Sequence, residues 1–289
     1  MNAVFCRDTV MERNILLTIE YDGGAYSGWQ IQPNVPTVQG EVEKALRRTT
    51  GRDIGIHGTS RTDAGVHAYG QRASFKTDCA IPTEKIAFAV NNALPKDIRI
   101  REAREVGPEF HARFSCTGKQ YIYKMKEHVS AFESRYYYEI GEGLDIRKMQ
   151  LAATYIKGTH DFKCFQAAGS DIRDSTVRTI FDISVNEINY LPAMSAGTEN
   201  GAHVTGHRPE KESGEKGFAL VVSGDGFLYN MVRIITGTLV DAGRGKIVPE
   251  ELEKIIAGRD RTKAGHTAPP QGLYLAEVFY PETTGRWEK

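Results

Sequence analysis

Residues 15–21 (ILLTIEY) alternate between apolar and polar positions, and this period of two is typical of a half-buried strand. The pattern breaks at Asp22-Gly23-Gly24, which predicts a turn. Further on, Thr37 is suited to cap a helix that ends near Gly51. One face of that helix carries four apolar residues, Val38, Val42, Ala45 and Leu46. The N-terminal region is therefore predicted to run strand, loop, helix.

Similar patterns continue to the end of the chain. Strands are predicted at residues 70–75, 97–106, 114–126, 176–188, 217–223 and 272–280. Helices are predicted from a Thr83 cap to Leu94, from Asp145 to Gly158, after the glycine-rich turn in 224–243, and at 249–258. ILLTIEYDGGAY and FALVVSGDGFLY share a strand, an Asp/Gly turn and an aromatic residue, which suggests two similarly built halves. The mixture predicts an α+β protein whose mixed sheet is flanked by helices.

Two segments depart from these patterns. Residues 191–215 are rich in Gly, Ser, Glu, Lys and His, so a mobile insertion or long hairpin tip is predicted there. Its His203 and His207 have no evident third ligand, and solvated side chains are expected rather than a metal site. Residues 1–13 are predicted to be a loose N-terminal extension.

Composition narrows the classes of function. The 289 residues, 40% of them hydrophobic, suffice for one large domain or two smaller ones. The 37 basic and 37 acidic residues cancel, so a polyanionic partner would have to be met by segregated charge. The cysteines form no close pair, which indicates neither a metal site nor a disulfide framework: Cys6, Cys79, Cys116 and Cys164. No apolar run approaches the roughly 18 to 20 residues of a membrane span, so a cytoplasmic protein is predicted.

Polar and reactive side chains are most closely spaced in residues 58–75 (GTSRTDAGVHAYGQRASF). An aspartate before Ala-Gly is often only a turn cap, so Asp63 by itself is not diagnostic. Its neighbours Arg61, His67 and Tyr69 add a charge, hydrogen-bonding groups and ring faces, which favour a functional site as the alternative.

Arg233 lies in an apolar helix between Val232 and Ile234. A desolvated arginine without a counter-charge is costly, so an acidic partner such as Asp63 is expected, unless the side chain reaches solvent from an exposed face. Tyr121 shares a strand face with Tyr123 and Met125. It is either a core residue or a ring that stacks on a base and helps to move a proton.

Basic residues recur in several loops, including Arg99, Arg101, Arg173, Arg178, Arg244, Lys246, Arg259, Arg261 and Lys263. Two interpretations remain open for them. They form either a solvated surface paired with acids such as Glu102 and Asp260, or dispersed contacts to a folded polyanion.

Taken in order, the chain from Ile15 to Tyr280 resembles the tRNA pseudouridine synthase A family. The resemblance is carried by the blocks YDGGAYSGWQ, TVQGEVEKAL, SRTDAGVHAYGQ, NNALPKDI, FHARFSCTGKQYIY, HDFKCF, GFLYNMVRIITGTL and APPQGLYLAEV. It implies isomerisation of uridine to pseudouridine in the tRNA anticodon stem-loop, at positions 38 to 40, by a homodimer without cofactor or metal. It also implies a pseudouridine synthase fold, in which two related halves, here residues 14–112 and 113–289, share a mostly antiparallel mixed sheet.

Carried over by motif, the resemblance assigns Asp63 as the catalytic aspartate, Tyr121 as the strand tyrosine and Arg233 as the helix arginine. It places Arg61 before the aspartate and Leu273 as the apolar residue beside the site, and His67 and Tyr69 are expected to help hold RNA. Three departures stand out: Ser60 replaces a common glycine, residues 191–215 look longer than usual, and residues 1–13 lie outside the resemblance.

The implied reaction breaks the C1′–N1 bond, rotates the uracil and rejoins it through C5, so the base must leave the stack. A carboxylate beside C1′ is expected either to attack it or to stabilise positive charge, and removal of the C2′ proton to give a glycal is the competing route. Two other classes are a catalytically silent RNA-binding protein and a carboxylate glycoside hydrolase. The second would need a paired acid motif, which the sequence does not show.

Overall fold

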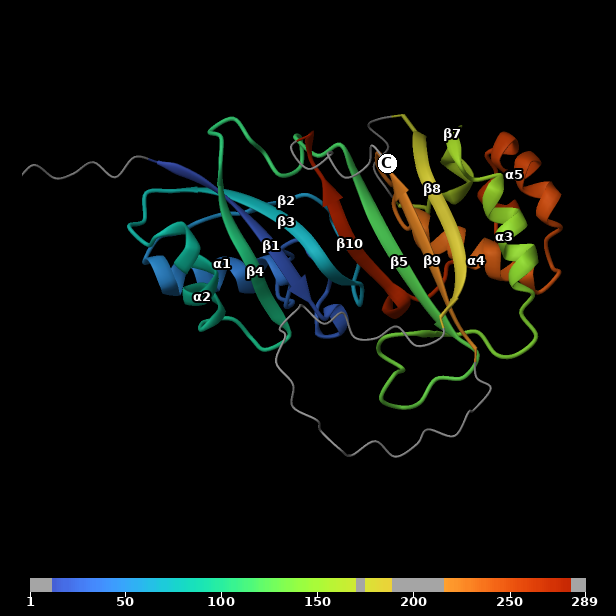
Figure 1. Cartoon of the computed structure of the whole chain (residues 1–289), viewed down its shortest axis with the longest axis horizontal. Helices are drawn as coiled ribbons and strands as arrows, with labels where there is room; N and C mark the ends of the chain where they lie inside the picture. The colour runs from blue at the N-terminus through green and yellow to red at the C-terminus, as the bar shows by residue number, and fades with distance from the viewer. Residues whose placement is uncertain (1–11, 170–174, 189–215, 282–289) are drawn as a thin grey trace, which may run out of the picture. The chain divides into compact units, whose positions relative to one another are not determined.

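The computed structural model describes residues 12–169, 175–188 and 216–281 (Figure 1). The predicted insertion at 191–215, with His203 and His207, lies outside them, as does nearly all of the predicted 1–13 extension. The strands are β1 (Arg13–Tyr21), β2 (His57–Gly58), β3 (His67–Thr77), β4 (Ile98–Val106), β5 (Gly118–Lys126), β6 (Tyr138–Glu139), β7 (Gly158–Asp161), β8 (Val177–Ile188), β9 (Gly217–Gly224) and β10 (Leu273–Phe279). The helices are α1 (Val38–Thr50), α2 (Thr83–Asn91), α3 (Ile146–Thr154), α4 (Met231–Gly243) and α5 (Leu252–Gly258).

The strands of the described residues belong to one mixed sheet in the order β4-β1-β3-β10-β5-β9-β8-β7, with β2 beside β3 and β6 beside β5. β1 pairs antiparallel with β3 and β4, and β7 pairs antiparallel with β8. β10 runs parallel to β3, and β6 runs parallel to β5. The predicted α+β class with a mixed sheet and flanking helices is confirmed.

The described residues divide into two compact units. The first contains residues 12–122, 223–227 and 273–281, and the second contains the other described residues, within 123–222 and 228–272. β5 and β9 each contribute residues to both units. In the first unit α2 contacts α1 and β4, and in the second α3 contacts α4 and β8 (Figure 1).

Local sequence explains the best-predicted elements. In α1 the Thr37 side chain accepts a hydrogen bond from the Gly40 N–H at 3.3 Å, and Gly51 ends the helix at a φ of 69°. All four predicted apolar residues of its inner face are buried: Val38, Val42, Ala45 and Leu46. Asp145 caps α3 as predicted, by accepting from the N–H groups of Arg147 and Lys148.

Helix α4 is apolar nearly all round and almost entirely buried, as expected for a helix surrounded by protein. Every residue from Met231 to Gly243 is buried except Arg233, which is half-buried. This buried helix therefore holds the backbone of Arg233 in place.

Helix α2 differs from its prediction at both ends. Pro82 occupies the cap position, while the Thr83 hydroxyl accepts from Arg13 at 3.1 Å, so the predicted Thr83 cap is wrong. The helix ends at Asn91 because this amide bonds both backbone groups of Ile100, at 2.8 Å each. The strand predicted at 114–126 begins only at Gly118.

Candidate active site

Asp63 lies in the turn that joins β2 to β3. The Val66 N–H donates to the Asp63 carbonyl at 3.1 Å, and Gly65 takes a φ of 78°, which only glycine adopts readily. Asp63 is half-buried, whereas Thr62 before it is buried. The chain thus presents the carboxylate from a closed turn.

The backbone before Asp63 is held by two buried side chains. Gln71, which is fully buried, accepts from the Ser60 N–H at 3.3 Å and donates to the Ser60 carbonyl at 2.7 Å. The Thr59 hydroxyl lies 3.0 Å from the Ala112 carbonyl and 2.9 Å from the Tyr280 hydroxyl. Satisfied buried networks of this kind hold one backbone arrangement.

A glycine lets a second loop pack against the back of the turn. Gly28 has a φ of 95°, and a Cβ there would lie 2.6 Å from the Thr62 carbonyl oxygen. The adjacent Trp29 N–H donates to that carbonyl at 3.0 Å. The Thr62 hydroxyl is 2.7 Å from the hydroxyl of the buried Tyr21. Backbone and side chain of Thr62 are therefore both fixed next to Asp63.

Tyr121 lies beside the segment that leads into this turn. Its side chain is 8% exposed, and its hydroxyl donates to the Ser60 hydroxyl at 3.5 Å. The Phe227 ring meets it edge-on, with centroids 5.1 Å apart. Burial raises the pKa of Tyr121 to about 12, and the negative charge of Asp63 adds to the rise. The phenol is therefore protonated at neutral pH.

His67 and Tyr69 belong to one column of rings. The Tyr274 ring stacks on His67 at 4.8 Å and on Tyr69 at 4.9 Å between centroids, across the parallel β3–β10 pair. Tyr69 is 38% exposed, whereas His67 is 2% exposed, so only Tyr69 offers open surface. We therefore retain Tyr69 as a proposed RNA contact and propose that His67 acts by supporting the column.

The His67 ring also connects the column to the turn after β1. Its Nδ1 lies 3.1 Å from the Gly23 N–H nitrogen and 3.1 Å from a carboxylate oxygen of Asp22. Nδ1 accepts from Gly23 when it carries no proton and donates to Asp22 when it carries one, so the two contacts belong to different tautomers or protonation states.

The remaining predicted residues of the first unit differ in exposure. Arg61 is exposed, two residues before Asp63, and its contact with substrate stays a prediction. Leu273 opens β10 and is 6% exposed, in keeping with an apolar packing role. Gln71 and Phe227 join the site without a role having been predicted for them, and Ser60, noted only as a departure from the family's glycine, bonds both Gln71 and Tyr121.

Arg233, in the second unit, is held by a loop after α5. Its Nε–H donates to the Ala268 carbonyl at 2.8 Å, and the Ala268 N–H donates to the Arg233 carbonyl at 3.1 Å. One guanidinium N–H donates to the Asn230 side chain at 2.8 Å. Asn230 itself has a left-handed φ of 59° just before α4. The ion pair of Arg233 with Asp63 would join the two units, and it stays a prediction.

The loop that holds Arg233 is itself tied to α4. His266 Nδ1 lies 2.9 Å from an Asp241 carboxylate oxygen, and Nε2 lies 2.9 Å from the Tyr138 hydroxyl. Two glycines permit the close approach, since a Cβ on Gly237 would lie 1.9 Å from the His266 carbonyl oxygen and one on Gly265 would lie 2.5 Å from Thr238. His266 thereby fixes the segment that carries Ala268.

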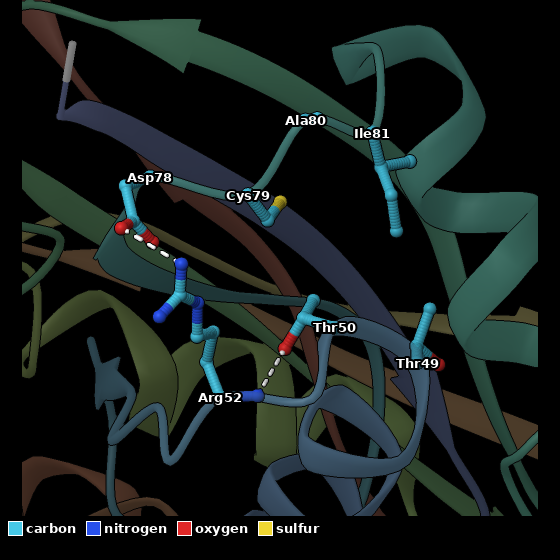
Figure 2. Close-up of a pocket in the computed structure, with 7 residues that line it drawn as sticks. All are labelled: Thr49, Thr50, Arg52, Asp78, Cys79, Ala80 and Ile81. Atoms are coloured by element: carbon cyan, nitrogen blue, oxygen red, sulfur yellow. Dashed lines mark hydrogen bonds and ion pairs between the residues drawn. The ribbon is translucent and has the colours of Figure 1, made fainter. Parts of the chain in front are cut away.

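A surface pocket of about 470 Å³ lies elsewhere in the first unit, between the end of α1 and the loop after β3 (Figure 2). An ion pair of Arg52 with Asp78, at 3.1 Å, lies along it. None of the predicted site residues lines it. The pocket therefore contributes nothing to the candidate site.

Comparison with known proteins decides the family. The family model for tRNA pseudouridine synthases matches residues 17–115 and 152–281. The chain belongs to the tRNA pseudouridine synthase family. It is 48% identical over 272 residues to tRNA pseudouridine synthase A of Ruminiclostridium cellulolyticum, and 44% identical over 270 residues to that of Acetivibrio thermocellus. Each match covers 93% of this chain and 100% of the relative.

Membership of this family confirms that the chain is an enzyme of the isomerase class. Within the described residues, no helix is long and apolar enough to cross a membrane. No cluster of three or more His, Cys, Asp or Glu side chains suited to a metal ion occurs among those residues either.

Proposed function

We propose that this member of the family converts uridine to pseudouridine in the anticodon stem-loop of tRNA, at positions 38 to 40, with Asp63 acting on the sugar. Family membership supports the reaction, and the resemblance of the sequence blocks supports the position. The catalytic role of Asp63 is supported by the structure of its turn. Gln71, Gly28 and Trp29 hold the adjoining backbone beside Tyr121.

The reaction is balanced without any oxidant or reductant. The C1′–N1 bond breaks, the uracil rotates, and a C1′–C5 bond forms; the C5 proton is lost and N1 gains a proton. An ionised Asp63 would either bond to C1′ or stabilise the positive charge that develops there. Holding the carboxylate in a rigid turn reduces the reorganisation needed at that step.

We assign Tyr121 a role in stacking and hydrogen-bond donation, and not in general proton transfer. With a pKa of about 12, the phenol is protonated at neutral pH, so it can stack on the flipped uracil and donate a hydrogen bond. As a resting general base it would be poor, because on the order of one molecule in 10⁵ carries a phenolate at pH 7. Tyr121→Phe should therefore retain more RNA binding than activity.

The role of Arg233 completes the proposed site. Pairing with Asp63 would keep the carboxylate ionised and oriented. Arg61 would contact a backbone phosphate, Tyr69 would offer its open ring face, and Leu273 would pack beside the uracil. A structure of the tRNA complex with Asp63 and Arg233 beyond ion-pair distance would contradict the pairing.

Release of tritium from RNA labelled at uridine C5 tests the reaction directly, because only substitution at C5 liberates the label. Anticodon stem-loops with a single labelled uridine at position 38, 39 or 40 should release it, whereas a stem-loop labelled at another position should not. A silent RNA-binding protein would release none. A glycoside hydrolase would instead free uracil and leave an abasic site.

Deuterium at C2′ separates the two chemical routes. Abstraction of the C2′ proton would give a primary isotope effect on single-turnover rates, whereas attack of Asp63 on C1′ would not.

We further propose a cytoplasmic homodimer, on the basis of the family resemblance and the tRNA substrate. Light scattering after size-exclusion chromatography should give twice the mass of the chain.

A further inference from the structure

Three neighbouring rings lie on the first unit, outside the Asp63 turn, as one stacked and one tilted pair. The centroids of His57 and His111 lie 4.9 Å apart, and those of His111 and Phe114 lie 4.4 Å apart. His57 is exposed, and Phe114 is 76% exposed. The Arg113 guanidinium lies 5.7 Å from the Phe114 ring centroid. We call His57, His111 and Phe114 the ring stack.

Local hydrogen bonds hold the ring stack in place. The His111 N–H donates to the Ser115 hydroxyl at 3.1 Å, and the Ser115 N–H donates to the His111 carbonyl at 2.9 Å. The Arg113 N–H donates to His111 Nδ1 at 3.1 Å, which fixes the ring orientation. His57 is held by strand pairing opposite Ser74. Such ordering lowers the entropy that a ligand must remove on binding.

The ring stack and the Asp63 turn share one anchor. β2, which carries His57, leads straight into Thr59 and on to Asp63. The Thr59 hydroxyl lies 3.0 Å from the carbonyl of Ala112, the residue between His111 and Arg113. The ring stack is therefore joined to the Asp63 turn by the backbone of residues 57–63 and by the Thr59–Ala112 hydrogen bond.

The chemistry of the surface favours a nucleobase over an apolar protein segment. Burial, followed by the nearby His57 and Arg113, lowers the pKa of His111, so its ring is neutral at neutral pH and behaves as an aromatic face. The exposed Phe114 supplies a second ring, and Arg113 supplies a cation over that ring. Proteins that bind unpaired RNA combine stacking rings with basic side chains in this way.

We propose that the ring stack binds an unpaired nucleobase of the RNA substrate by stacking on Phe114, while Arg113 contacts the adjoining phosphate. This inference rests on the proposed function, since it adds a second contact for the same RNA. The bound base is one that flanks the target uridine. It is recognised through stacking on the face of its ring, whichever base it is.

The test compares exposed phenylalanines of the same unit. Phe114→Ala is matched by Phe88→Ala, because Phe88 is 73% exposed on α2. Dissociation constants are measured with an anticodon stem-loop whose target uridines are replaced by cytidine, so that no turnover occurs. Phe114→Ala should weaken binding about tenfold, Phe114→Tyr should restore it to within about threefold, and Phe88→Ala should have no effect.

Arg113→Gln gives an independent readout. Loss of one phosphate contact should lower the slope of log affinity against log salt by about one, whereas loss of stacking in Phe114→Ala should leave that slope unchanged. Unchanged circular dichroism shows that each variant is folded.

Binding by Phe114→Ala within twofold of wild type, or an equal loss in Phe88→Ala, would overturn the inference. So would unchanged RNA affinity accompanied by dissociation of a dimer, which would make the stack an interface between copies of the chain. Failure of the wild-type protein to release tritium would instead sink the proposed function, while the binding series would still report on the ring stack.

Discussion

Tyr121 shows how much the surroundings of a single residue decide. The sequence left two interpretations, a core residue or a participant in the reaction. The ring is buried, its hydroxyl donates to that of Ser60, and the charge of Asp63 adds to its raised pKa. A part in the reaction stays a proposal. The bond to Ser60 does not follow from the strand pattern, since Ser60 lies 61 residues from Tyr121 in sequence.

The raised pKa of Tyr121 predicts a stability change in alkali. Unfolding lowers the pKa from about 12 back toward 10.0, so the contribution of the buried phenol is fully present below pH 10. It is then lost as the pH rises toward 12, at about 1.4 kcal/mol per pH unit. Urea unfolding from pH 9 to pH 12 should show a shallower decline in Tyr121→Phe than in wild type. Parallel curves would mean that Tyr121 titrates normally.

At the scale of elements, the turn that carries Asp63 depends on a close approach by Gly28. Gly28→Ala combines left-handed strain of about 1 to 2 kcal/mol with a Cβ that collides with Thr62. Gly51→Ala is the matched control, because Gly51 also has a positive φ but faces open space. Both variants should lose stability in urea unfolding, yet only Gly28→Ala should lose tritium release. Equal activity in the two folded variants would contradict a positioning role for Gly28.

The loop behind Arg233 gives a second prediction at this scale. His266→Ala removes the bridge between Asp241 and Tyr138, so Ala268 and the guanidinium that it holds gain freedom. We expect kcat to fall about tenfold with little change in KM. His128→Ala is the control, since that exposed histidine lies near surface acids, with Glu142 at 3.2 Å, and is not part of the loop that holds Arg233.

A double substitution shows whether His266 acts through Arg233. In an Arg233→Ala background, His266→Ala should cause no further loss of kcat, because its target is already absent. An additive loss would assign His266 a role independent of the arginine.

Elements with strong local signals were predictable, and those that depend on distant partners were not. α1 carries its own cap and apolar face, and it matched its prediction in detail. Helix α2 ended early because Asn91 bonds Ile100 on the neighbouring strand, and no local pattern reveals that contact. β2, β6 and β7 are short, of two to four residues, and exist only through pairing with longer strands.

At the scale of the whole molecule, the sequence predicted the class of fold but not the pairing that builds the site. Thr59, at the start of the site, bonds Tyr280, which is 221 residues away. The parallel β3–β10 pair brings Tyr274 between His67 and Tyr69. Such contacts depend on strand order, which residue periodicity does not encode. The halves predicted at 14–112 and 113–289 stay a prediction.

The proposed chemistry of the whole enzyme depends on Asp63, and one measurement tests it most directly. Tritium release from C5-labelled anticodon stem-loop RNA is compared for wild type, Asp63→Asn and Asp53→Asn. Asp53 is the control, since it is an exposed carboxylate of the same unit that pairs with Arg47. We expect release by wild type and Asp53→Asn but none above background by Asp63→Asn, which should bind the RNA within about tenfold of wild type because the change removes one charge and little volume. Wild-type-like release by Asp63→Asn would contradict the assignment.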